Sequence, residues 1–308
     1  MKATLSTILN EIRINNSFYA RSELYGSWGF ENPASNGAIF HYVVEGEFEL
    51  KTLEGEIYKF KQGDLVLTVN GKGHFLQSHD GVQIKQLEEL DLTKDGTNIL
   101  EVKSGSSGKK TVLICGGMSL NPSWHPLFKA LPTFIYLKRE EQVCTAWLDK
   151  LIELMNIEVE LGLSGSEAII TRLCEVLVIE TIRKWIDKKN ENLGWALALQ
   201  DKNIGNALVK MHTNPEISWT VEELARQADM SRTSFSEHFS KKVGSSPIRY
   251  LNFLRMNLAA DDLKNGIKTI TEIANTVGYD SVVSFNRAFK KFWGKPPGEF
   301  RVLPSNVL

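Results

Sequence analysis

The sequence predicts an α+β protein with a β-rich front part, a helical hairpin and an all-α C-terminal part. Three observations predict this arrangement. Short apolar segments separated by turn signals fill residues 36–118, apolar residues recur at helical spacing after Pro132, and a helical unit is duplicated in the last hundred residues. A length of 308 residues suits about two domains with a connecting element. We place the boundaries at 1–135, 136–192 and 193–308.

The β-rich part is recognised by short apolar runs and by the turns between them. Residues 39–50, 65–69 and 111–116 are such runs, and Asn70-Gly71 is a strong tight-turn pair. Several short strands at this spacing predict a sandwich or a barrel.

The helical hairpin follows from a change of period. The first apolar stripe repeats every four residues, at Val143, Trp147, Leu151 and Met155. A second stripe covers residues 169–182, and a Gly/Ser-rich stretch joins the two. The second helix is apolar over more than one face, so packing within its own domain and self-association both stay open.

Composition excludes several classes of protein. Cys115, Cys144 and Cys174 are scattered without CxxC spacing, which favours reduced thiols over disulfides or zinc. Polar residues interrupt the N-terminal segment before an apolar core forms, so no signal peptide is expected. No run of about 18 apolar residues predicts a membrane helix. We expect a cytoplasmic protein without membrane contacts.

The formal net charge of −1 conceals an asymmetry along the chain. From residue 201 to the end, 15 Lys and Arg face 11 Asp and Glu, a balance of +4, whereas the rest carries −5. A mildly basic segment indicates a nucleic-acid partner only when a binding motif accompanies it.

That motif is a duplication within the basic segment. The first half of each copy matches at a distance of 49 residues: Thr220/Thr269, Glu223/Glu272, Ala225/Ala274 and Asp229/Gly278. The second half matches at a distance of 50: Phe235/Phe285, Phe239/Phe289, Gly244/Gly294, Pro247/Pro297 and Tyr250/Phe300. One residue has been inserted near the second turn.

Each matched position has a mechanical role. The Thr-x-x-Glu pairs are capping boxes, and the alanines are small where a second helix crosses closely. Asp229 and Gly278 occupy a turn that needs a left-handed residue. The paired phenylalanines are core anchors, and Pro247 and Pro297 begin further helices. Each copy is therefore a helix-turn-helix.

Two copies in the basic segment, each ending in a Lys pair, favour DNA binding over a tandem repeat used for packing or protein contacts. With the phenylalanines inward, Arg287 suits a guanine edge, Asn286 an adenine, Glu237 a cytosine amino group, and Val282 or Val283 a thymine methyl. The candidates for phosphate contacts are Arg232, Lys241, Lys242, Lys290 and Lys291.

These residues resemble a known pattern, the DNA-binding domain of AraC-type transcription regulators. The resemblance covers both helix-turn-helix units, the helix between them and the closing Gly294-x-x-Pro297-x-x-Phe300-Arg301. It implies a regulator of asymmetric promoter sites with RNA polymerase as a candidate partner, and it leaves the roles of activator and repressor both open. It also implies a set of base-contacting residues: Thr233, Ser236, Glu237, Val282, Val283, Asn286 and Arg287.

The front part is similar to the cupin-type sensor domains of a subgroup of that family. Residues 63–74 look like the second cupin motif, with Val69 where Pro is usual, and Cys115-Gly116 also matches. The resemblance implies a cupin-like β-barrel that receives a small-molecule or oxidant signal, and a hairpin that makes a homodimer.

Enzymatic cupins bind a divalent metal through several histidines and a carboxylate. Here no His-x-His occurs, so we expect no metal, no cofactor and no catalysis, although His41, His74 and His79 are candidates for convergence. His41 and His74 are candidates for an effector pocket or for structural positions in the barrel wall, and Cys115 is a candidate for redox sensing or for a small buried apolar residue. The alternatives are a metal-dependent cupin enzyme fused to a DNA-binding domain and a cysteine-based redox-sensing regulator.

Overall fold

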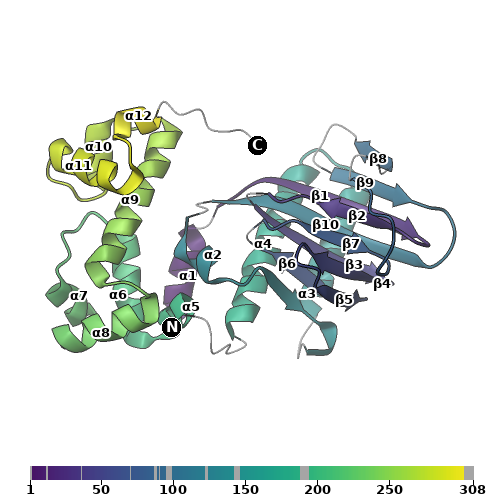
Figure 1. Ribbon diagram of the computed structural model, residues 1–308, viewed down its shortest axis with the longest axis horizontal. Coiled ribbons are helices and arrows are strands. Elements are labelled where there is room, and N and C mark those ends of the chain that lie inside the picture. Colours follow the sequence, from purple (N-terminus) through teal and green to yellow (C-terminus); the bar gives the residue numbers. More distant parts are fainter. Residues whose placement is uncertain are drawn as a thin grey trace. The chain divides into compact units, whose positions relative to one another are not determined.

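The protein is described from a computed structural model (Figure 1). The structure describes residues 2–11, 13–35, 37–69, 71–86, 89, 91–94, 99–121, 124–141, 146–187 and 194–301. It divides into two compact units. One is Ile12–Glu191, and the other combines Met1–Glu11 with Asn192–Leu308. Cys144 lies outside the described residues.

The first unit contains two β-sheets. Its strands are β1 (Arg13–Tyr25), β2 (Gly29–Asn32), β3 (Gly37–Glu45), β4 (Glu47–Thr52), β5 (Ile57–Lys61), β6 (Leu65–Thr68), β7 (His74–Gln77), β8 (Asp91–Lys94), β9 (Ile99–Ser104), β10 (Lys110–Asn121) and β11 (Phe134–Leu137). The larger sheet has the order β11-β6-β3-β10-β1-β9-β8, and the smaller one β2-β7-β4-β5. All pairs are antiparallel except β1 with β9.

The core of this unit lies between the sheets. Leu24 and Leu113 of the larger sheet belong to the same buried cluster as Phe48, Leu50 and Leu76 of the smaller one. The expected sheet-rich cupin-like region is confirmed, but its described strands form two facing sheets and no single closed ring of hydrogen bonds. A sandwich results because each sheet has an apolar face that the other covers.

The first unit also contains helical elements. They are α2 (Pro126–Ala130), the 3-10 turn η2 (Arg139–Glu141), α3 (Ala146–Leu161) and α4 (Ser166–Asp187), of which α3 and α4 contact the larger sheet. The predicted hairpin is α3 and α4, which pack on each other, while α4 also contacts β1 and β11. Tyr42 donates to Asp149 of α3 at 3.0 Å, and Tyr19 donates to Asn156 at 3.2 Å. The hairpin is thus part of the same compact unit as the sheets.

The second unit is helical. Its helices are α1 (Lys2–Glu11), α5 (Gly194–Gln200), α6 (Lys202–Thr213), α7 (Val221–Gln227), α8 (Arg232–Val243), α9 (Pro247–Asn265), α10 (Ile270–Thr276), α11 (Val282–Trp293) and α12 (Pro297–Arg301). Within it, α9 runs between the pair α7–α8 and the pair α10–α11 (Figure 1). No helix among the described residues is long and apolar enough to cross a membrane.

The first helix of the chain belongs to this helical unit, although the sequence places residues 1–135 in the front part. α1 contacts α5 and α6, and its Ile8 and Leu9 are buried. Burial of these side chains accounts for the grouping, because an isolated helix of 10 residues is marginal in water.

Candidate nucleic-acid interface and buried histidine pair

Both predicted capping boxes are present. Thr220 Oγ1 accepts from the Glu223 amide at 3.2 Å, and Glu223 Oε2 accepts from the Thr220 amide at 2.8 Å. Thr269 and Glu272 repeat this geometry at 3.2 and 2.7 Å. The first helix of each copy therefore begins at equivalent positions with its free amides satisfied.

The turns also behave as the repeat predicts. Asp229 has φ 52°, and in the described part of the chain it is the only residue other than glycine with positive φ. Gly278, its counterpart, has φ 76°. A Cβ on Gly278 would collide with the carbonyl oxygen of Glu216. Glycine is therefore required there both for its conformation and for the close approach of another backbone segment.

The recognition helices α8 and α11 turn their phenylalanines inward. Phe235, Phe239, Phe285 and Phe289 are completely buried, and the rings within each pair lie 5.5 and 5.6 Å apart. Their burial fixes which face of each helix is free for another molecule.

The predicted base-contacting residues lie on that free face to different degrees. Thr233, Glu237, Val283 and Arg287 are exposed, whereas Ser236, Val282 and Asn286 are half-buried. Val283 is 70% exposed, so its methyl groups are accessible to another molecule. The Oδ1 atom of Asn286 is buried without a hydrogen-bond partner among the described residues. In this rotamer the amide does not present both of its groups to an adenine.

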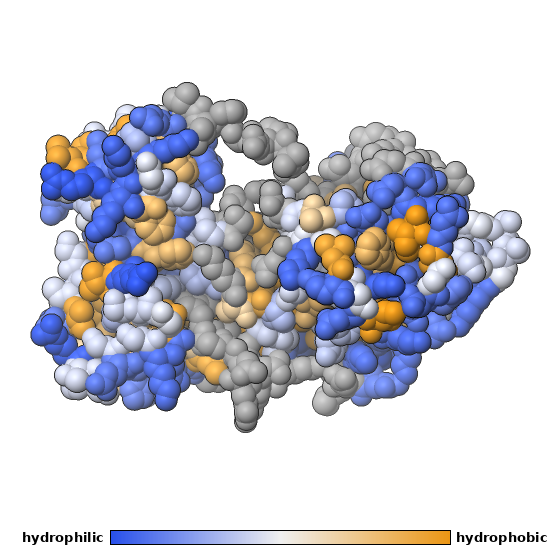
Figure 2. Space-filling model, in the orientation of Figure 1, coloured by the Kyte–Doolittle hydropathy of each residue, from blue (hydrophilic) through white to orange (hydrophobic). Residues whose placement is uncertain are grey.

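The predicted phosphate-contacting residues separate into two groups. Lys241, Lys290 and Lys291 are exposed. By contrast, Arg232 pairs with Glu222 at 2.9 Å, and Lys242 pairs at 2.9 Å with Asp201, which also caps α6. On the face drawn in Figure 2, hydrophilic residues cover most of the C-terminal unit.

A second constellation lies between the two sheets of the first unit. Strands β1, β10 and β3 are neighbours, and their register places Cys115 beside Ala20 and His41. His41 Nδ1 lies 3.0 Å from Cys115 Sγ, and His41 Nε2 lies 2.9 Å from Nε2 of His74 in the smaller sheet. The histidine pair therefore connects the two sheets.

The protons in this chain of contacts can be assigned. His74 Nδ1 lies 3.2 Å from the carbonyl oxygen of Lys72, which only accepts, so Nδ1 carries a hydrogen. In a neutral ring His74 Nε2 then accepts from His41 Nε2, and His41 Nδ1 accepts from the thiol of Cys115. The thiol hydrogen bond thus points at an unprotonated imidazole nitrogen.

Burial explains why these groups are neutral. It lowers the pKa of His41 well below 6.5, and the neighbouring His74 lowers it further. Burial also lowers the pKa of His74, and it raises the pKa of Cys115 to about 12. Cys115 is consequently a protonated thiol at neutral pH.

A small cavity adjoins the thiol. It measures about 30 Å³ and is lined mostly by apolar side chains, together with Asn32, His41 and Cys115. Asn32 is buried, and its Nδ2 has no hydrogen-bond partner among the described residues. Roughly 10–15 Å³ accommodates one water, so the cavity has room for one or two water-sized molecules.

The structure separates the third histidine from this pair. His79 is exposed and contacts Ser27 Oγ at 3.2 Å. Among the described residues no group of three or more His, Cys, Asp or Glu side chains is arranged to hold a metal ion.

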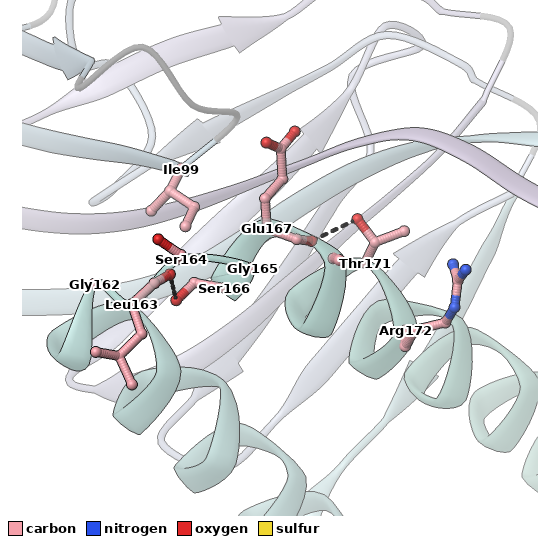
Figure 3. Close-up of a pocket in the computed structure, with 10 residues that line it drawn as sticks. Ile99, Gly162, Leu163, Ser164, Gly165, Ser166, Glu167, Thr171 and Arg172 are labelled. Carbon is pink, nitrogen blue, oxygen red and sulfur yellow. Dashed lines mark hydrogen bonds between the residues drawn. The ribbon is translucent and has the colours of Figure 1, made fainter.

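A larger open cleft of about 580 Å³ lies at the start of α4 (Figure 3). Two of its hydroxyl groups are used locally: Ser166 donates to the Leu163 carbonyl at 2.8 Å, and Thr171 donates to the Glu167 carbonyl at 2.9 Å. These two bonds lie within α4 and the turn before it, so neither hydroxyl marks a ligand site.

Comparisons with known proteins match both the sheet-rich part and the helical part of the chain. Residues 3–187 match a family model described as a cupin, and residues 224–302 match one described as a helix-turn-helix domain. The chain belongs to the AraC-type transcription regulators with an N-terminal cupin domain. This regulator therefore combines a cupin sensor domain with a helix-turn-helix domain of a kind that binds double-stranded DNA.

Three relatives align with most of the regulator. The transcriptional regulator MtrA of Neisseria gonorrhoeae is 30% identical over 302 residues, covering 96% of this chain and 97% of the relative. AlkR of Acinetobacter baylyi is 29% identical over 300 residues, covering 96% and 98%. The RCS-specific activator RclR of Escherichia coli is 27% identical over 263 residues, covering 85% and 83%.

Proposed function

We propose that the regulator binds promoter DNA in the cytoplasm as a homodimer and performs no catalysis. Its recognition helices α8 and α11 read two neighbouring half-sites. The observation that carries this proposal is the equivalence of the two helix-turn-helix units, whose caps, turns and buried phenylalanines match while their outer faces differ. Different outer faces suit an asymmetric site, with RNA polymerase as a candidate partner beside it.

Within this proposal the exposed residues Thr233, Glu237, Val283 and Arg287 are the strongest candidates for base contacts. Ser236, Val282 and Asn286 contact bases after a change of rotamer or at the edge of the groove. Lys241, Lys290 and Lys291 contact phosphates directly, whereas Arg232 and Lys242 must first leave Glu222 and Asp201.

Selection from a random duplex library tests the DNA-binding proposal. The full chain is expected to enrich a two-part motif, and its affinity for that motif is expected to fall as salt rises, because phosphate contacts release counterions. If a random duplex competes as well as the selected one at every salt concentration, sequence-specific regulation is ruled out.

For the signal, we propose that a water-sized oxidant reaches Cys115. Organic effectors usually occupy pockets of roughly 300–1,000 Å³, and the cavity beside Cys115 is far smaller. The relative RclR is an RCS-specific activator, which supports this proposal. An organic effector held by His41 and His74 is the second candidate, and it requires the sheets to separate.

The chemistry at the cluster balances for hydrogen peroxide. His41 Nδ1 accepts the thiol proton while the Cys115 sulfur attacks one oxygen of hydrogen peroxide and the O–O bond breaks, so that no separate thiolate and imidazolium form beforehand. Sulfur becomes a sulfenic acid and loses two electrons to the peroxide. The leaving oxygen departs as hydroxide and takes the proton back from His41 as water.

An oxidant titration of DNA affinity tests this role of Cys115. The wild type is expected to change its affinity on treatment with hydroperoxide or hypochlorite, whereas Cys115→Ser is not. Cys174→Ser is the matched control, since Cys174 is also buried and burial raises its pKa to about 12. An unchanged wild type, or a response that persists in Cys115→Ser, excludes this signal.

The homodimer proposal is supported by an apolar stripe on the helical hairpin. Leu154 is 54% exposed, Ile157 44% and Leu161 57% on α3, and Ile169 and Val176 are each 47% exposed on α4. Contiguous apolar side chains on one helical face are typical of a protein interface. A second copy of this chain, packed through the same stripe, is the partner that we propose.

A further inference from the structure

Arg255 lies in the middle of α9, the helix between the two helix-turn-helix units, and is only 8% exposed. Its Nε donates to the carbonyl oxygen of Pro215 at 2.7 Å, and its Nη2 donates to that of Ile217 at 2.8 Å. Both acceptors belong to the loop that leads from α6 into α7. The Arg255 guanidinium therefore joins the loop before the first helix-turn-helix to α9.

The Arg255 side chain also contacts the second helix-turn-helix. The Arg255 guanidinium lies 5.9 Å from the ring centroid of Tyr279, which follows Gly278 in the turn between α10 and α11. A Cβ on Gly278 would lie 2.6 Å from Nη2 of Arg255 and would also collide with the Glu216 carbonyl. The loop before the first helix-turn-helix and the turn inside the second helix-turn-helix thus meet at Arg255.

Other contacts attach each helix-turn-helix to α9 separately. The rings of Phe239 in α8 and Tyr250 in α9 lie 5.8 Å apart at the first helix-turn-helix, and Tyr250 Oη lies 2.7 Å from Nε2 of His212 in α6. At the second helix-turn-helix, Trp293 Nε1 of α11 donates to the Met256 carbonyl of α9 at 3.1 Å. Removing the Arg255 side chain therefore leaves each helix-turn-helix attached to α9. What is lost is the link, through the guanidinium, between the loop at Pro215 and the turn at Tyr279.

Arginine suits this position for a geometric reason. Its planar fork donates in several fixed directions and stacks on an aromatic ring at the same time. A lysine ammonium keeps the charge but is a single point on a flexible stem. Burying a charge is costly unless it is well hydrogen-bonded, so packing alone does not explain an arginine here.

We propose that Arg255 is a positioning residue that fixes the separation of the recognition helices α8 and α11, and with it the spacing between the two DNA half-sites. This inference rests on the proposed readout of DNA by both helices. Two rigidly joined readers bind well only where the half-sites match their separation, about 34 Å for successive turns of the major groove. A looser joint accepts several spacings and loses the affinity gained from pre-organisation.

The test compares the full-length wild type with Arg255→Lys in selection from a random duplex library. We expect the wild type to select two half-motifs at one spacing. Arg255→Lys should select the same half-motifs over several spacings, bind the wild-type site about tenfold more weakly, and bind a duplex with one intact half-site within about twofold of wild type. Arg249→Lys, an exposed arginine of α9, is the matched control and should keep the single spacing.

The spacing profile separates positioning from a purely structural role, because partial unfolding lowers the affinity for all spacings equally. Tyr279→Leu removes the aromatic face but leaves both carbonyl bonds in place, and it should also broaden the profile. A folded Arg255→Lys or Tyr279→Leu protein that keeps the wild-type profile overturns the inference alone. A wild type that selects no two-part site overturns the proposed readout and the inference together.

Discussion

Arg287 and Lys291 are exposed basic residues on the same helix, α11, but they are expected to contribute differently to DNA binding. Arg287 lies one helical turn before Lys291, nearer the start of the helix. The N-terminal part of a recognition helix contacts base edges, while the basic residues towards its end meet the backbone. The distinction can be measured one residue at a time.

Arg287→Ala is expected to cost about 1–3 kcal/mol on the selected site and to relax specificity at one base pair. Lys291→Ala should weaken binding to all sequences similarly and flatten the salt dependence. Titrations of specific and random duplexes at several salt concentrations measure both effects. An equal loss on both duplexes for Arg287→Ala would contradict its role as a base reader.

His41 and His74 predict a pH dependence of stability. Burial lowers the pKa of both in the folded protein, so below their unfolded value of about 6.5 the unfolded chain binds more protons. Stability is therefore retained above about pH 6.5 and lost as the pH falls. Each neutral histidine lowers the free energy of unfolding by up to about 1.4 kcal/mol per pH unit below that value.

Urea unfolding of the wild type and His41→Gln between pH 7.5 and 5.5 checks this expectation. The substitution removes one titrating ring, so the loss of stability towards pH 5.5 should be smaller than in the wild type. Parallel pH profiles for the two proteins would show that the histidine pair does not control acid sensitivity.

Among the elements, α3 combines two tasks. One face is fixed to the larger sheet through Asp149 and Asn156, which accept from Tyr42 and Tyr19. The opposite stripe exposes Leu154, Ile157 and Leu161. The tyrosines alternate along β3 and β1 with His41 and Ala20, which line the buried side. The helix proposed for dimerisation is thus bonded to the strands that carry the sensor residues.

Leu154→Glu combined with Ile157→Glu is expected to convert the dimer to a monomer. Burying two carboxylates in an apolar interface is costly, so the dimer dissociation constant should rise at least about a hundredfold. Light scattering after size exclusion measures the mass. Ser106→Glu, an exposed position between β9 and β10, controls for added charge and should stay dimeric. A wild type that is already monomeric at micromolar concentration would contradict the homodimer.

For the whole molecule, the question is whether the cupin domain is a sensor or an enzyme. Metal analysis of the purified full-length protein is expected to find far less than one equivalent of iron, manganese or zinc. The reason is that His41 turns one ring nitrogen to His74 and the other to Cys115, so the three side chains do not converge on one point. Stoichiometric metal that survives dialysis would revive the metal-dependent enzyme.

Local rules made the C-terminal domain predictable. Capping boxes, a left-handed turn residue and paired phenylalanines each act within a few residues, and the repeat displayed them twice. The arrangement of the strands in two facing sheets was harder to predict. Alternation of apolar and polar residues indicates strands, but it does not indicate whether their sheets close into a barrel. Asn32 and Arg255 were missed, since a lone Asn in a strand or an Arg in a helix carries no local signal of a burial that distant segments impose.

The class of protein and the outward faces of the recognition helices could therefore be predicted from the residues alone, because period, caps and turns act over a short range. The three-dimensional fold brings His41, His74 and Cys115 into one chain of contacts across two sheets. It also decided that Lys242 is held by Asp201, and that Arg255 joins the loop at Pro215 to the turn at Gly278. These contacts join residues 23 to 74 positions apart in the chain, and the folding of the segments between them brings each pair together.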